Sequence, residues 1–314
     1  MAKHAGGEEN RKNTFEYSLA RLRPEDIEVR LARDVQEIAA EKRNRLMRLV
    51  VLILSVCLFV GSFAYIVFKV TQYRKSEAFY EGLIEDFENG ERALARDPGD
   101  MPTAAFGTVD GRGNASYNQL FSRMKARLVS MQDINPDVCG WIIIPGTKHI
   151  NYPILQSTDN EYYLDHEFKG GYLNAGSIFV DYTCDRDFNG NHNTVIYGHN
   201  MQNGMMFSEL ISFLDEEFFK NNKYVYVYTM QGVYTYEVFA VYKTNYLYKY
   251  TQTSFPTHAD FVAFANEMRD NSMFRRDGIE FDENSRIITL STCTNGQRTD
   301  RYCVQALLVD AYNE

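Results

Sequence analysis

The sequence lacks the short motifs that are typical of metal and nucleotide sites. No Cys-x-x-Cys or His-x-x-x-His pair occurs among its five cysteines and six histidines, so we expect no metal site. Neither a P-loop nor a glycine-rich dinucleotide fingerprint is present. The net charge of −9 comes without a clustered cationic stretch, which argues against nucleic acid as a partner.

Cysteine is too sparse for a fold that depends on disulfides. Cys57 lies in an apolar run, which leaves Cys139, Cys184, Cys293 and Cys303 for the rest of the chain. A domain of about 245 residues buries enough surface to be stable without covalent staples. We therefore expect no disulfide framework, and Cys293 with Cys303, which flank one loop, is the pair that could form a bridge.

Long uncharged runs are also rare, and the one that occurs covers residues 49–68. A helix over these 20 residues would cross a hydrocarbon core of about 30 Å. Because 48 residues precede the run, a transmembrane helix is favoured over a cleaved signal peptide. Lys42, Arg43, Arg45 and Arg48 crowd its amino side, so the N-terminus should be cytoplasmic and the C-terminal part extracellular.

Composition divides the chain into four segments. Residues 1–48 are rich in charges of both signs and are predicted to form a cytoplasmic segment. After the transmembrane helix, residues 69–115 are predicted to be a stalk, with a helix over 76–96 followed by a linker rich in Pro, Gly and Asp. Residues 116–314 are predicted to be an extracellular domain.

The extracellular domain begins with a helix that ends at Asn135–Pro136 and continues as a mainly β fold. Strands are indicated by alternation and by β-branched and aromatic residues, and their spacing predicts a closed barrel or a sandwich. Helical patterns over 205–222 and 258–274 interrupt them. The strand segments are GWIIIP, GSIFVDY, NTVIYGH, KYVYVYTM, GVYTYEVFAVYKTN, RIITLSTC and YCVQALLVDAY.

A cysteine and an arginine lie on either side of one loop, at the ends of two of these strands. Cys293 ends the segment RIITLSTC, and Arg301 opens the next strand eight residues later. If the two strands are adjacent and antiparallel, the guanidinium lies beside the thiol and beside any oxyanion formed by its attack. A thiolate stabilised by a nearby cation is an effective nucleophile.

A third candidate comes from elsewhere in the chain. His199 follows the apolar strand NTVIY, at a place suited to a general acid or base. Taken alone, a strand-end histidine is more often structural than catalytic. A single cysteine outside the cell is likewise more often buried, or half of a disulfide, than a nucleophile.

Together these segments resemble the sortase family of membrane-anchored cysteine transpeptidases. The resemblance rests on VIYGHN, on TLSTC, and on the arginine at the head of the following strand. The segments DINPDVCGWIIIPGTKHINYPILQSTDNEYYLDHEF and GSIFVDY are similar to the family as well, and the similarity extends from about residue 116 to the C-terminus. The helices before the barrel and the helix inserted before the cysteine strand look most like class B. The resemblance thus implies a closed sortase-type β-barrel of about seven to eight strands with N-terminal and inserted helices.

The resemblance also implies a role for each matching residue. Cys293 would attack the scissile Thr carbonyl of a sorting signal and form a thioester, while His199 would act as acid and then as base. Arg301 would hold the substrate backbone and the oxyanion. Ser291 matches a position that lines the substrate groove, and Tyr226 is a further candidate for that groove.

Two features depart from the simplest family pattern. Arg298 lies closer in sequence to Cys293 than Arg301 does, although the strand-initial position favours Arg301. Cys303 shares a strand face with Arg301 by alternation, so a disulfide between Cys303 and Cys293 would inactivate the enzyme.

A class B sortase would be a single-pass protein of the cell membrane in a Gram-positive bacterium. Its partners would be secreted proteins that carry a C-terminal sorting signal, and peptidoglycan or its lipid-linked precursor as the amine acceptor. No cofactor is implied, and no acidic cluster in the sequence demands the calcium that some family members use.

Two alternatives stay open at this point. Another cysteine peptidase or a wall L,D-transpeptidase would use the same thiol chemistry, although the latter usually has a glycine just before its cysteine, where this chain has Thr292. The non-enzymatic alternative is a membrane-anchored barrel that binds peptides, with Cys293 as a structural residue.

Overall fold

The computed structural model describes residues 23–94, 114–293 and 299–313. Contacts between residues divide the chain into two compact units, residues 1–69 and residues 70–314. The first unit contains most of α2, a single helix over Pro24–Leu94. The sequence suggests a separate stalk helix from residue 76, but residues 69–75 contain no Gly or Pro, so nothing interrupts the helix.

Helix α2 is the one helix in the described ranges that is long and apolar enough to cross a membrane. Its most apolar 18-residue window has a mean hydropathy of 2.7, and none of that window is buried against protein. Leu58 and Phe59, for example, are exposed within this run. These properties agree with a membrane anchor within residues 49–68.

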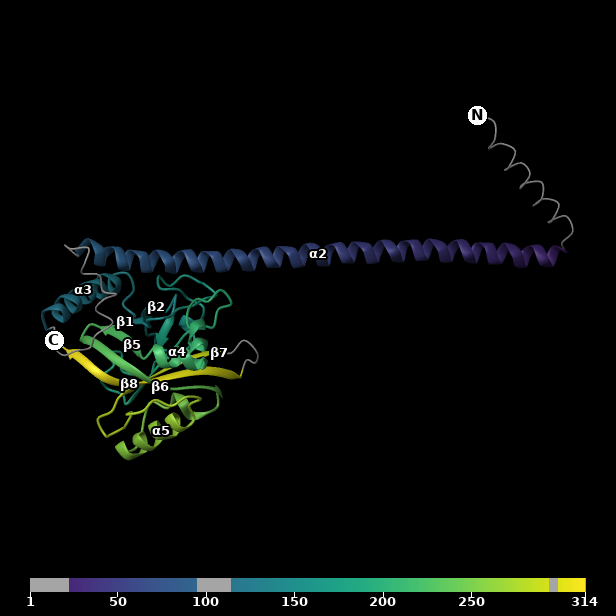
Figure 1. The fold of residues 1–314 in the computed structure, drawn as a ribbon. Coiled ribbons are helices and arrows are strands. Elements are labelled where there is room, and N and C mark those ends of the chain that lie inside the picture. Colours follow the sequence, from purple (N-terminus) through teal and green to yellow (C-terminus); the bar gives the residue numbers. More distant parts are fainter. Residues whose placement is uncertain (1–22, 95–113, 294–298, 314) are drawn as a thin grey trace. The chain divides into compact units, whose positions relative to one another are not determined.

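The second unit is built on a closed barrel of eight strands in the order β1-β2-β3-β4-β7-β8-β6-β5 (Figure 1). Neighbouring strands are antiparallel, except for the parallel pairs β2–β3 and β4–β7. The strands are β1 Val138–Ile143, β2 Asn151–Leu155, β3 Ile178–Val180, β4 Asn193–Tyr197, β5 Tyr224–Thr229, β6 Gly232–Asn245, β7 Ile287–Cys293 and β8 Asp300–Asn313.

The barrel confirms the mainly β prediction and adds one strand to it. The seven predicted strands are present, and the additional strand is β2, which contains Pro153. Proline has no N–H to donate and therefore weakens a strand signal in the sequence. In the structure, β2 pairs with β3 only at Ile154 and Leu155, beyond the proline.

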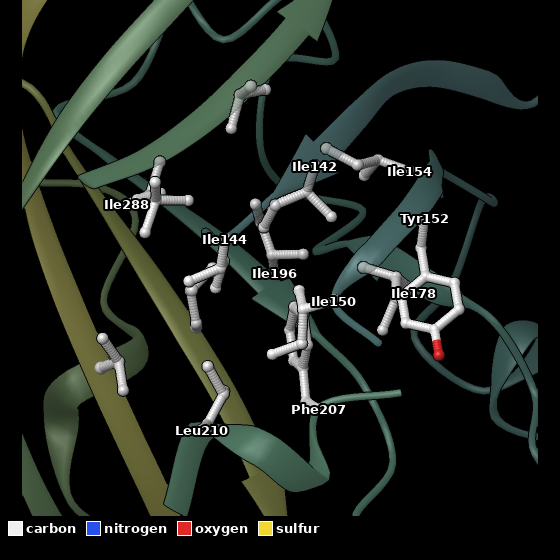
Figure 2. Close-up of a cluster of buried hydrophobic side chains, with 14 of the residues drawn as sticks. Ile142, Ile144, Ile150, Tyr152, Ile154, Ile178, Ile196, Phe207, Leu210 and Ile288 are labelled. Atoms are coloured by element: carbon white, nitrogen blue, oxygen red, sulfur yellow. The ribbon is translucent and has the colours of Figure 1, made fainter. Parts of the chain in front are cut away.

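Aliphatic side chains fill the barrel interior (Figure 2). Ile142, Ile154, Ile178, Ile196 and Ile288 come from five different strands, and each is at most 1% exposed. Burial of each such side chain stabilises the fold by about 1.5–3 kcal/mol. This rigid interior fixes the strand ends that carry the candidate catalytic residues.

Helices cover different sides of the barrel wall (Figure 1). Helix α3, Asn114–Gln132, packs Phe121 and Leu128 against Trp141 of β1. Helix α5, His258–Asp270, packs against β6, β7 and β8. Both helices were predicted from the sequence. The short helices are η2 Tyr162–Leu164, η3 Ser208–Leu214, α4 Glu216–Asn221 and η4 Lys249–Thr251.

The part of α2 that belongs to the second unit is anchored by Tyr80. This side chain is 1% exposed, its hydroxyl donates to the carbonyl oxygen of Gly176 at 2.5 Å, and it lies 3.0 Å from the Ser177 hydroxyl. The helical pattern in the sequence points instead to Phe79 and Leu83, which are only partly buried. A hydrogen-bonded tyrosine is buried here because both ends of the side chain find partners.

Candidate active site

Three adjacent strands bring the predicted catalytic residues to one edge of the barrel. Strands β7 and β8 are antiparallel, and Cys293 pairs with Arg301 across them. Strands β4 and β7 are parallel, with Tyr197 opposite Ser291. His199 and Cys293 each follow that pair by two residues, so both reach the same edge. The structure describes the backbone of Cys293, while its side chain lies outside the described residues.

Gly198 allows the chain to turn between β4 and His199. A Cβ atom at this position would lie 2.8 Å from the ring of Phe207 and would also overlap Ile178. Only glycine fits this close approach of backbone to side chains. The Gly198 N–H donates to the Ser291 carbonyl oxygen at 3.2 Å, which continues the β4–β7 pairing by one step.

The ring of His199 is held by a backbone carbonyl. Its Nε2 atom lies 2.5 Å from the carbonyl oxygen of Leu164, and its own carbonyl oxygen accepts the Phe207 N–H at 2.9 Å. A carbonyl oxygen can only accept, so Nε2 carries the proton and Nδ1 is left to accept or release one. The Leu164 carbonyl oxygen can equally accept a hydrogen bond from the doubly protonated ring.

Arg301 is a half-buried cation at the same barrel edge as His199. Its Nη1 donates to the carbonyl oxygen of Asp300 at 3.0 Å, and its guanidinium carbon lies 5.8 Å from the ring centre of Tyr246. Asp300 in turn pairs with Lys243 at 2.9 Å, and the hydrogen bond from Lys243 holds the pKa of Asp300 below its usual value. The alternative residue, Arg298, lies outside the described residues.

A cavity of about 220 Å³ joins these elements. Three of the predicted site residues line it: His199, Ser291 and Arg301. The remaining lining residues were not predicted: Asn160, Leu164, Phe179, Tyr197, Gly198 and Thr292. Tyr197 and Thr292 lie within the motifs VIYGHN and TLSTC, so these motifs could have pointed to them. Asn160 and Leu164 come from the η2 region, which carries no catalytic signal in the sequence.

Two hydroxyl groups on β7 have different environments at the cavity. The Ser291 hydroxyl is 2.9 Å from that of Tyr250, a buried residue of η4, and this hydrogen bond fixes its position. The Thr292 hydroxyl is buried and has no hydrogen-bond partner within the part of the chain that the structure describes. A buried hydroxyl without a partner costs about 1–3 kcal/mol, which a bound group could recover.

Cys303 is isolated from the cavity and forms no disulfide. Its side chain is fully buried, and Cys303 is a free thiol. It packs beneath α5 with Tyr242 and Phe264. Burial raises the pKa of the Cys303 thiol to about 12. Cys303 and Arg301 lie on the same face of β8, as alternation predicts, but helix α5 covers that face at Cys303.

Tyr226 is not brought to the site. It is 6% exposed and packs in the aromatic cluster beneath α3, on β5, which pairs with β1 and β6 and not with β4 or β7. It therefore serves packing in this structure and does not line the cavity. Among the described residues, no group of three or more His, Cys, Asp or Glu side chains could hold a metal ion.

The fold and the arrangement of these residues agree with what comparison with known proteins finds. Residues 142–309 match the model of the sortase domain. The chain therefore belongs to the sortase family, whose members are cysteine transpeptidases, and the peptidase, L,D-transpeptidase and non-enzymatic alternatives are set aside.

Within that family its relatives are named sortase B. Sortase B of Listeria monocytogenes is 38% identical over 180 residues, which is 57% of this chain and 72% of that protein. Sortase B of Staphylococcus aureus is 34% identical over 188 residues, 59% of this chain and 76% of that protein. The X-ray structure of Clostridium perfringens sortase B matches with a TM-score of 0.55 and 38% identity, over 58% of this chain and 99% of that chain.

Proposed function

We propose that this sortase cleaves the C-terminal sorting signal of a secreted protein after a Thr and joins that Thr to an amino group of peptidoglycan or its lipid-linked precursor. The observation that supports this most directly is the meeting of His199, Arg301 and the Cys293 backbone at one barrel edge, beside a cavity that can receive a peptide.

The first half-reaction breaks the peptide bond. The Cys293 thiolate attacks the Thr carbonyl carbon, and the carbonyl oxygen becomes an oxyanion that Arg301 stabilises by its permanent charge. When this tetrahedral intermediate collapses, the C–N bond breaks and the leaving amine takes a proton from His199. The products are a thioester on Cys293 and the released C-terminal part of the signal.

The second half-reaction forms the new amide. An amine of the acceptor attacks the thioester carbonyl and gives up a proton to His199, and the C–S bond breaks to regenerate Cys293. Transfer requires the amine to compete successfully with water. Ser291, fixed by Tyr250, is placed to contact the bound signal at the cavity wall.

The proposed location supports this choice of acceptor. An anchor at residues 49–68 with its N-terminus in the cytoplasm would place residues 116–314 outside the cell membrane, facing the wall of a Gram-positive bacterium. It would also keep the enzyme near membrane-retained substrates, which raises their effective concentration. The basic residues before the apolar run support this orientation.

The test is cleavage of quenched fluorescent peptides that carry NPQTN-like, LPxTG-like and SPxTG-like motifs. We expect the full chain to cleave one of them and Cys293→Ala to cleave none, because the variant lacks the nucleophile. Cys303→Ala is the matched control and should retain cleavage, since this thiol is buried away from the cavity. Cleavage by Cys293→Ala would contradict the mechanism. Failure of the wild type on every peptide would contradict the substrate class.

A further inference from the structure

We infer that Asp181 is a positioning residue for the catalytic cavity: its buried carboxylate fixes Asn160 and Tyr197 on one wall and thereby sets the affinity for the peptide that donates the acyl group. The inference rests on the proposed function for the identity of that peptide. Asp181 follows β3 directly and does not itself line the cavity.

One carboxylate oxygen of Asp181 faces the cavity wall. Its Oδ2 accepts a hydrogen bond from the Asn160 side-chain amide at 2.8 Å and from the Tyr197 hydroxyl at 2.9 Å. Asn160 comes from the loop before η2 and Tyr197 from β4, two residues before His199. A single oxygen therefore joins two separate cavity-lining segments.

The other oxygen faces away from the wall and is also satisfied. Oδ1 accepts the Thr183 N–H at 2.9 Å and the Thr183 hydroxyl at 2.7 Å. Asp181 is only 7% exposed, and four neutral donors surround its carboxylate. Hydrogen bonds to a charged acceptor are stronger than those between neutral groups, so this arrangement holds its donors firmly.

These contacts also determine which hydrogen-bonding groups the wall presents. The Asn160 Oδ1 accepts the Tyr182 N–H at 3.0 Å, so the second N–H of the Asn160 amide is left as a donor. Burial, and after it the charge of Asp181, raises the pKa of the Tyr197 hydroxyl far above its usual value, so it stays protonated and donates to Asp181. Its oxygen is then left as an acceptor. A donor beside an acceptor suits the backbone of an extended peptide.

The carboxylate cannot be replaced by an amide without loss. Each oxygen accepts two hydrogen bonds, so in Asp181→Asn either orientation of the amide sets an NH₂ group against two donors. The Thr183 pair includes a backbone N–H that cannot move away. The NH₂ group should therefore face Asn160 and Tyr197, which releases both from their positions.

The experiment compares full-length Asp181→Asn with Thr183→Val as a matched control, using the peptide that the wild type cleaves. Thr183→Val removes one donor to the same carboxylate on the side away from the cavity. We expect Asp181→Asn to raise KM about tenfold with kcat little changed, as for lost binding, and Thr183→Val to leave KM unchanged. Labelling of Cys293 by a small methanethiosulfonate should proceed at the wild-type rate in both variants.

A double variant separates positioning from general destabilisation. If Asp181 acts through Tyr197, the double variant Asp181→Asn/Tyr197→Phe should raise KM by a smaller factor than the product of the factors for the two single variants. Two results would overturn the inference. One is a KM for the double variant that equals the product of the two single increases, and the other is an equal change of KM in Asp181→Asn and Thr183→Val.

A substrate-independent readout keeps the two proposals distinguishable. The Asn160 side-chain amide proton that bonds to Asp181, assigned by NMR from its loss in Asn160→Asp, should exchange slowly with solvent in the wild type and in Thr183→Val. It should exchange quickly in Asp181→Asn. If the wild type cleaves no peptide, the proposed function fails while this measurement still decides the role of Asp181. Slow exchange in Asp181→Asn would refute that role.

Discussion

At the scale of single residues, burial determines how reactive each cysteine thiol is. Burial raises the pKa of Cys139, Cys184 and Cys303 to about 12. At pH 8 such a thiol is a thiolate in only about one molecule in ten thousand, and the thiolate is the reactive form. We predict that iodoacetamide at pH 8 modifies Cys293 in the folded second unit and spares these three, as measured by peptide mapping. Modification of Cys303 as fast as Cys293 would show that its helical cover opens readily.

The sequence predicts the chemistry of the site better than its walls. Cys293, His199 and Arg301 could be located because each stands at a strand end, and strand ends of neighbouring strands meet at one edge. Asn160 could not be located, because its position depends on a hydrogen bond to Asp181, 21 residues away in the chain. Tyr226 does not line the cavity, because an aromatic residue on a strand packs in a core as readily as it lines a groove, and its predicted contact with the substrate stays a prediction.

At the scale of elements, α5 is defined by a capping box. Thr257 accepts the Asp260 N–H at 3.2 Å, and Asp260 accepts the Thr257 N–H at 3.0 Å. We predict that Thr257→Ala lowers the free energy of unfolding by about 1 kcal/mol in urea titrations, because the Thr257 hydroxyl accepts the Asp260 N–H and also donates to the Asp260 carboxylate at 2.7 Å. Thr257→Ser keeps that oxygen and should recover most of the loss. Peptide cleavage should be unchanged in both variants, since Thr257 does not line the cavity.

The strands and helices follow from local patterns, and the exceptions have physical causes. Strand β7 alternates between the barrel interior at Ile288 and Leu290 and the outer face at Thr289 and Ser291, as a period of two predicts. Strand β2 was missed because Pro153 masks its signal. The pairing of β4 with β7, whose partners such as Asn193 and Ile287 are 94 positions apart in sequence, is not encoded in either strand alone; it results from closing the barrel.

At the scale of the whole molecule, α2 supplies both the apolar run and the Tyr80 side chain buried in the second unit. A soluble fragment should therefore begin at about residue 70. One that begins at residue 76 would lose Tyr73, which packs on the core, and the bond from the Ser76 hydroxyl to the Gln72 carbonyl oxygen at 3.1 Å. The folded unit thus extends further toward the N-terminus than the predicted boundary at residue 116.

The apolar run should determine where the enzyme acts. We expect the full chain in lipid vesicles and the fragment 70–314 to cleave a soluble peptide with equal kcat/KM, because the candidate active-site cavity is lined by residues between 160 and 301. A peptide anchored to the same vesicles should be cleaved faster by the full chain, by on the order of a hundredfold, since tethering makes the encounter local.

Leu58→Arg in the full chain is the matched control for this comparison. A charge near the middle of the apolar run should weaken membrane insertion, so the advantage on anchored peptide should fall while cleavage of soluble peptide persists. Rates are normalised to the amount of Cys293 that a membrane-impermeant thiol reagent labels, which counts only outward-facing enzyme. Equal rates for the full chain and the fragment on the anchored peptide would mean that residues 49–68 do not serve to bring enzyme and substrate together.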